Sequence, residues 1–132
     1  MDLLLKNVRV VRPGGDGAED LDIGISDGKI ARLEANIAAD DAREVIDGGN
    51  KLVFPGLVDG HMHVGIYSPL AEDAATESKA AAMGGVTSAI TYFRTGQYYL
   101  NKGGPYAEFY PEVLETSAGN YWVDYALSLI HI

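Results

Sequence analysis

Residues 52–64 constrain the fold of this chain more than any other stretch, and they read Leu-Val-Phe-Pro-Gly-Leu-Val-Asp-Gly-His-Met-His-Val. Pro55 and Gly56 break an extended apolar run, and a new short strand is predicted to follow them. Because side chains alternate between the two faces of a strand, His61 and His63 are expected to point to the same side. Two imidazoles that converge on one point are what a divalent transition metal requires from a protein edge.

The sequence before Pro55 has the pattern of a small all-β unit. Its strand-like segments, which are apolar or alternate between apolar and polar residues, span residues 3–11, 21–25, 29–33, 43–46 and 51–54. Residues 26–28, Ser-Asp-Gly, lie between two alternating segments and predict the turn of a hairpin. Turn signals recur about every eight to twelve residues, which is typical of a sandwich or barrel. We therefore predict a small β-sandwich-like domain over residues 1–54.

The pattern changes after Pro55. Alanine-rich and β-branched segments alternate, and they predict a helix over 72–83, a strand over 86–93, a helix over 106–118 and a strand over 121–127. Gly84 and Gly85 provide the stop signal of the first helix. Strands and helices that alternate with short connections indicate parallel βα units.

The predicted fold class is therefore α/β: the small β-sandwich-like unit, followed over residues 55–132 by about three βα units. A closed TIM barrel, (β/α)8, needs eight such units and typically about 250 residues. The residues after Phe54 can supply less than half of one, so we expect an incomplete barrel. The chain is accordingly interpreted as an N-terminal fragment of a larger protein.

Charge and cysteine content restrict the function. The chain has 10 Lys and Arg against 19 Asp and Glu, and its net charge of −9 argues against nucleic-acid or anionic-membrane partners. It has no cysteine, so a metal site would have to use imidazole and oxygen ligands. No apolar run approaches a membrane span, and residues 1–6 lack the pattern of a secretory signal. These features predict a cytoplasmic protein.

Residues 55–63, Pro-Gly-Leu-Val-Asp-Gly-His-Met-His, resemble the opening metal motif of the amidohydrolase superfamily. With its flanking sequence, from about residue 3 to about residue 127, the chain looks most like the cyclic-amide branch: dihydropyrimidinase, hydantoinase, allantoinase and dihydroorotase. The resemblance implies that His61 and His63 are zinc-type ligands at the carboxyl end of the first barrel strand. A bare His-x-His is often two solvent-facing histidines, but the predicted strand context favours ligands.

The resemblance also implies the rest of the site. The family holds two metals with a carboxylated lysine, two later histidines and an aspartate, all of which would lie beyond Ile132. Lys79 is expected in a helix and Lys102 in a loop, so neither matches the family's lysine, and no catalytic residue is assigned within the chain. The complete enzyme would use a binuclear centre, most simply zinc, to hydrolyse a small-molecule cyclic amide. The family also implies a homo-oligomer.

Three other residues are candidates for the same site. Asp59 could accept an imidazole N–H of a ligand if the strand stays regular, or it could be a strand-end carboxylate. Tyr67 could line the substrate pocket or pack within its loop, and Arg94 could bind substrate or form a surface ion pair. Dihydroorotases usually carry an arginine soon after the second histidine, whereas Ile66 and Tyr67 occupy that neighbourhood here. This difference favours a hydantoinase-like substrate.

The last residues depart from the family pattern. Ser128 stands where the family commonly has histidine, and residues 128–132 resemble translated adapter sequence, so they are interpreted as a non-native tail and His131 is placed in no site. Two alternatives to an enzyme remain open. One is a non-catalytic, dihydropyrimidinase-like scaffold protein, which the presence of both His61 and His63 disfavours. The other is an unrelated β protein with an incidental His-x-His, which the βα pattern disfavours.

Overall fold

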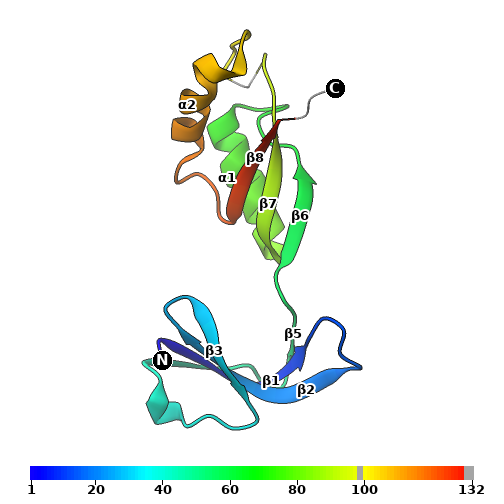
Figure 1. The fold of residues 1–132 in the computed structure, drawn as a ribbon, viewed down its shortest axis with the longest axis vertical. Coiled ribbons are helices and arrows are strands. Elements are labelled where there is room, and N and C mark those ends of the chain that lie inside the picture. The colour runs from blue at the N-terminus through cyan, green and yellow to red at the C-terminus, as the bar shows by residue number, and fades with distance from the viewer. Residues whose placement is uncertain (98–99, 130–132) are drawn as a thin grey trace. The chain divides into compact units, whose positions relative to one another are not determined.

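The computed structural model describes residues 1–97 and 100–129. The chain divides into two compact units, Met1–Pro55 and a second that starts at Gly56 (Figure 1). No helix in the described ranges is long and apolar enough to cross a membrane.

The first unit is a five-stranded sheet in the order β3-β2-β1-β4, with β5 also paired to β1. Its strands are β1 (Leu3–Val11), β2 (Ala18–Ser26), β3 (Lys29–Glu34), β4 (Glu44–Asp47) and β5 (Leu52–Val53), and a 3-10 helix, η1 (Ala39–Asp41), precedes β4. The predicted hairpin is confirmed as the antiparallel pair β2 and β3. Its turn residues Asp27 and Gly28 have φ of 50° and 70°, the left-handed values that a tight hairpin turn requires.

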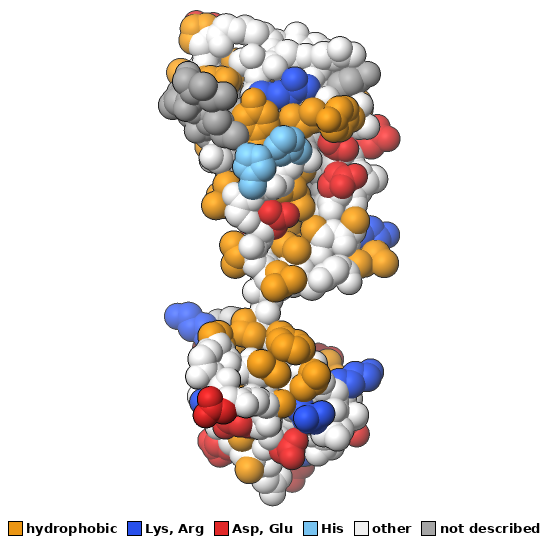
Figure 2. Space-filling model, turned by 90° about the vertical axis from the view of Figure 1, so that its right-hand side faces the viewer, with side chains coloured by type: hydrophobic (Ala, Val, Ile, Leu, Met, Phe, Trp, Pro, Cys, Tyr) orange, Lys and Arg blue, Asp and Glu red, His pale blue; other side chains and the backbone are white. Residues whose placement is uncertain are grey.

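The first unit is built on a single sheet, whereas the turn spacing predicted a sandwich-like arrangement. Val8, Val10 and Ile23 form its buried cluster. The strands described in residues 1–55 all belong to one sheet, because β4 and β5 both return to pair in parallel with β1. Apolar side chains consequently remain on the surface, where Figure 2 shows a group of them, and Phe54 is 60% exposed.

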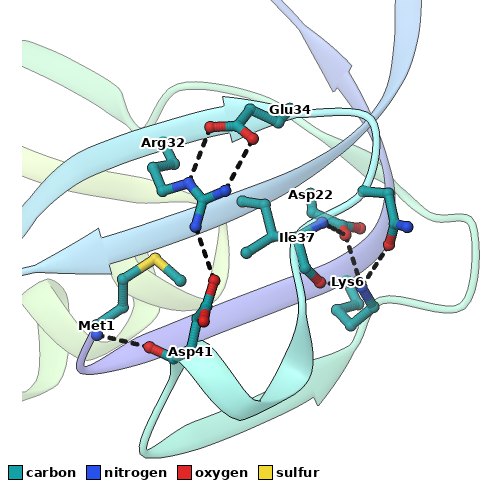
Figure 3. Close-up of polar contacts among 8 residues, drawn as sticks. Met1, Lys6, Asp22, Arg32, Glu34, Ile37 and Asp41 are labelled. Carbon is teal, nitrogen blue, oxygen red and sulfur yellow. Dashed lines mark hydrogen bonds and ion pairs between the residues drawn. The ribbon is translucent and has the colours of Figure 1, made fainter.

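A buried carboxylate fixes an irregularity in the central strand of this unit (Figure 3). Asp22 is 3% exposed, and it accepts hydrogen bonds from Lys6 Nζ at 2.8 Å and from the main-chain N–H groups of Asn7 and Ile37 at 2.9 Å each. Asn7 has φ of 56° and lies where the register of β1 and β2 shifts. Burial alone raises the pKa of Asp22, but the bonds from Ile37, Lys6 and Asn7 outweigh it and leave the pKa below its ordinary value.

The second unit alternates strands and helices, and its parallel βα arrangement is confirmed. The elements are β6 (Leu57–Met62), α1 (Leu70–Met83), β7 (Val86–Phe93), α2 (Tyr106–Ser117) and β8 (Asp124–Leu129). The three strands are parallel, in the order β6-β7-β8. The helices pack through a cluster of buried side chains, against which Met62 and Leu127 also pack: Val64, Leu70, Ala74, Phe109 and Val113.

Two elements of the second unit begin at other residues than the sequence predicted. The first helix begins at Leu70 rather than at residue 72, because the 2%-exposed Leu70 side chain joins the core cluster. The last strand begins at Asp124 rather than at residue 121. The N–H of Trp122 donates to Ser78 Oγ on α1 at 3.0 Å, so this residue is bound to a helix and does not pair with β7.

Candidate metal site

The two histidines lie at the carboxyl end of β6, which is also the edge where β7 and β8 end. Their Nε2 atoms are 2.8 Å apart, and the ring centroids are 4.8 Å apart with the planes at 60°. Both side chains are exposed, and they are the pale blue group in Figure 2. The structure therefore brings the imidazoles of His61 and His63 to one point at the surface.

This geometry fits two ligands of a single metal ion. Two nitrogens bound to one tetrahedral zinc ion, each at about 2.0–2.1 Å, would lie about 3.3 Å apart. The Nε2 atoms of His61 and His63 are close to this separation, and they need to move apart only slightly. No group of three or more His, Cys, Asp or Glu side chains that could hold a metal occurs among the described residues. The donor set within them is thus two imidazoles.

The Asp59 side chain binds the main chain near the end of β6. Its Oδ1 accepts the backbone N–H of His61 at 2.9 Å. The register between β6 and β7 is irregular between Asp59 and Met62, so simple alternation does not hold across these residues. A contact between Asp59 and an imidazole stays a prediction.

Tyr92 lies beside the histidines, and sequence reasoning gave it no role. Its ring centroid is 5.4 Å from that of His63, with the planes at 38°. Tyr92 belongs to the last part of β7. The sequence could have indicated this position, because the carboxyl ends of neighbouring parallel strands meet at the same edge of a sheet.

The segment that follows the histidines is anchored at three successive residues. The Val64 side chain is fully buried. Gly65 is buried and donates its N–H to Asp73 Oδ2 on α1 at 2.7 Å, and its φ of 73° favours glycine. The carbonyl of Ile66 accepts a hydrogen bond from Arg94 Nη2 at 3.0 Å. Asp73 lies in the first turn of α1.

The two candidate substrate residues lie in different surroundings. The Tyr67 side chain is 83% exposed. Arg94 is partly buried, and Nη2 also donates to the carbonyl of Gln97 at 3.1 Å, while its buried Nε has no hydrogen-bond partner. The partners that the structure gives Arg94 are therefore main-chain carbonyls. Substrate contact by either residue stays a prediction.

A partly buried tyrosine lies near Asp73. Burial raises the pKa of Tyr121 to about 12, and the negative charge of Asp73 acts in the same direction. The ring of Tyr121 stacks on that of Tyr125, with centroids 4.0 Å apart.

The two lysines that the sequence singled out have other partners. Lys79 Nζ is 5.9 Å from the ring centroid of Trp122, and Lys102 pairs with Glu112 on α2. Of the predicted non-native tail, Ser128 belongs to β8, whereas residues 130–132, including His131, lie outside the described residues.

Comparison with known proteins gives a consistent set of relatives, although no protein-family model matches. The chain is 44% identical over 93 residues to an allantoinase from Desulfitobacterium hafniense. The matched region covers 70% of this chain and 19% of the allantoinase. It is 42% identical over 91 residues to a dihydroorotase from Geobacter sp., and this match covers 67% of this chain and 21% of the dihydroorotase. The structure of an L-hydantoinase (dihydropyrimidinase) from Arthrobacter aurescens matches with a TM-score of 0.73 and 30% identity, covering 96% of this chain and 27% of that one.

The chain thus spans about a fifth of the length of the curated relatives it matches. This share agrees with the expectation that it corresponds to the opening portion of such a protein.

Proposed function

Because this chain belongs to the cyclic amidohydrolases, the family of the allantoinases, dihydroorotases and hydantoinases, we propose that it provides the first two ligands of a metal-dependent amide hydrolase. The complete protein would cleave a C–N bond of a small cyclic amide. One observation carries the proposal: His61 Nε2 and His63 Nε2 converge at the carboxyl end of the first of three parallel strands. Active sites of barrel enzymes lie at this end of the strands.

The chain's own residues would prepare the site in defined ways. To offer Nε2 lone pairs to a metal ion, both imidazoles must be neutral and carry their proton on Nδ1. The Asp59 carboxylate fixes the peptide of His61, and the Tyr92 ring limits the space in which the His63 ring can turn. A divalent metal held there, in our proposal zinc and one of a pair, would activate water and polarise the amide carbonyl.

The finer fold assignment is part of the same proposal. The parallel order β6-β7-β8, with helices α1 and α2 packed through one core, supports the opening three units of a TIM barrel. On the sheet, Val58 and Ile90 remain 70% and 39% exposed, as expected of strands that would bury these side chains in a completed barrel. The further ligands and the catalytic base would come from later units.

A hydantoinase-like substrate is favoured over dihydroorotate. Ile66 and Tyr67 occupy the neighbourhood in which dihydroorotases usually have an arginine, and the exposed Tyr67 ring is free to contact a ligand. Arg94 would be a second contact. The cytoplasmic location and homo-oligomeric assembly of the complete protein belong to the proposal as well. The alternative is a non-catalytic scaffold relative, which would not need two converging imidazoles.

Substitution of the histidines tests the metal assignment. His61→Ala and His63→Ala should each lower the Zn²⁺ affinity of the chain at least tenfold, because one imidazole cannot hold the ion alone. Isothermal titration with Zn²⁺ measures the affinity. His131→Ala provides a matched control, since this histidine is assigned to no site, and its affinity should match that of the unsubstituted chain. Equal Zn²⁺ binding by all three variants would refute the assignment.

A further inference from the structure

The position of the second histidine is not fixed by the sheet. The strand β6 ends at Met62, so His63 lies outside the strand to which His61 belongs. The residues after His63 must therefore help to fix the position of its ring. We name residues 64–66 the anchor segment.

The anchor segment is bound from helix α1 by a buried carboxylate. Asp73 is 9% exposed, and its Oδ2 accepts the Gly65 N–H at 2.7 Å. None of the ion pairs among the described residues includes Asp73. A buried carboxylate without a cation is costly unless it is hydrogen-bonded, and a bond from N–H to a charged acceptor is stronger than a neutral one. The geometry therefore gives this carboxylate a specific partner in the segment after the histidines.

A helix-dipole role alone does not explain Asp73. Glu72 precedes it in the first turn of α1 and is exposed to solvent, where an acidic side chain can interact with the helix dipole at little cost. Asp73 is buried instead, and it is directed at the main chain of Gly65.

An arginine also binds the anchor segment. Arg94 follows β7, and its Nη2 donates to the carbonyls of Ile66 and Gln97 at 3.0 and 3.1 Å. The Gly65 N–H belongs to the peptide group between residues 64 and 65, and the Ile66 carbonyl to the one between residues 66 and 67. Two side chains of opposite charge thus bind two nearby peptide groups of the same segment.

From this arrangement we propose that Asp73 and Arg94 are positioning residues, which hold the anchor segment so that the His63 imidazole meets that of His61. The inference rests on the proposed metal site, and it gives Arg94 a main-chain role in addition to the substrate contact proposed above. Neither residue touches the metal in this proposal, and both act through residues 64–66.

Conservative and disruptive substitutions separate positioning from general stability. Asp73→Asn keeps an acceptor oxygen for Gly65, whereas Asp73→Ala removes it. Glu72→Ala is the matched control on the same turn of α1. We expect Asp73→Ala to weaken Zn²⁺ binding about tenfold, as loss of a residue that orients a metal ligand typically does, and Asp73→Asn to stay close to the unsubstituted chain.

The positioning itself is read by nuclear magnetic resonance on the metal-free chain. The unsubstituted chain should show a nuclear Overhauser effect between the rings of His61 and His63, together with slow exchange of the Gly65 amide proton. In Asp73→Ala the effect should disappear and the amide should exchange faster, with Glu72→Ala unchanged. Arg94→Ala removes the hydrogen bond to the Ile66 carbonyl and should also weaken the contact between the histidine rings. This variant replaces Asp73→Ala in the test if Asp73→Ala does not fold.

Two results would overturn the inference. One is faster Gly65 exchange in Asp73→Ala with an unchanged contact between the histidine rings, which would mean that Asp73 holds the segment without positioning His63. The other is an equal loss of Zn²⁺ affinity in Asp73→Ala and Glu72→Ala. Failure of the proposed function is a separate result, seen when the unsubstituted chain and His61→Ala bind Zn²⁺ equally weakly, and the ring contact still tests the positioning.

Discussion

At the scale of single residues, the two histidines reach the same point by different routes. His61 is part of β6, whereas His63 follows its last residue. The alternation of side chains that predicted their convergence assumes a regular strand, yet the register of β6 and β7 is irregular between Asp59 and Met62. The Nε2 atoms nevertheless lie 2.8 Å apart. Local alternation thus predicted the correct outcome, while the anchors of residues 64–66 contribute to it.

Asp22 illustrates how a single buried carboxylate makes stability depend on pH. Because its pKa is below the ordinary value in the folded chain, its stabilisation is present above the unfolded pKa of about 3.9 and is lost as the pH falls through the folded pKa. Asp22→Asn should lower the free energy of unfolding by about 2 kcal/mol at neutral pH, because charged hydrogen bonds from Lys6, Asn7 and Ile37 are weakened.

Thermal unfolding followed by circular dichroism measures this effect. The difference between Asp22→Asn and the unsubstituted chain should shrink as the pH is lowered below about 4, because the carboxylate of the unfolded chain takes up a proton there before the native one does. Asp20→Asn on the same strand is the control, since that side chain is 87% exposed and should change stability little. A difference that stays constant from neutral to acidic pH would contradict the assigned role of the charge.

At the scale of elements, one serine on α1 forms a hydrogen bond with the segment that leads into β8. Ser78 is fully buried, and its hydroxyl donates to the carbonyl of Ala74 at 2.5 Å and accepts the Trp122 N–H at 3.0 Å. This bond crosses 44 residues of sequence. It explains why the last strand starts later than its β-rich sequence predicts.

Ser78→Ala should destabilise the second unit by about 1–2 kcal/mol, because the Trp122 N–H loses its partner. Trp122 is the sole tryptophan of the chain, so its fluorescence during urea unfolding reports on this unit directly. Thr76→Ala is the matched control on the same helix, since this exposed hydroxyl bonds only to carbonyls of its own helix. An unchanged unfolding midpoint in Ser78→Ala would show that the link contributes nothing.

At the scale of the whole molecule, the described residues contain only part of the ligand set that the proposed metal centre requires. His61 and His63 converge, but no third metal-ligating side chain of the described residues joins them. The chain also spans about a fifth of its curated relatives. We therefore propose this activity only for a longer protein that contains this chain.

We accordingly expect no measurable turnover of hydantoin or dihydrouracil by the 132-residue chain, even with added Zn²⁺. An absorbance assay for ring opening measures this, with His61→Ala as the reference for background. Turnover by the unsubstituted chain that disappears in His61→Ala would contradict the expectation, because two imidazoles would then suffice for catalysis.

Much of the molecule was determined by the sequence itself, because those features depend on residues close together in the chain. The left-handed turn at Asp27 and Gly28 and the parallel βα order of the second unit follow from turn chemistry and periodicity. Only the tertiary structure decided that Asp73 binds Gly65, because a buried carboxylate takes whatever donor the packing of a distant segment presents. The parallel return of β4 and β5 to β1 was decided in the same way, since pairing between strands separated by many residues leaves no local pattern.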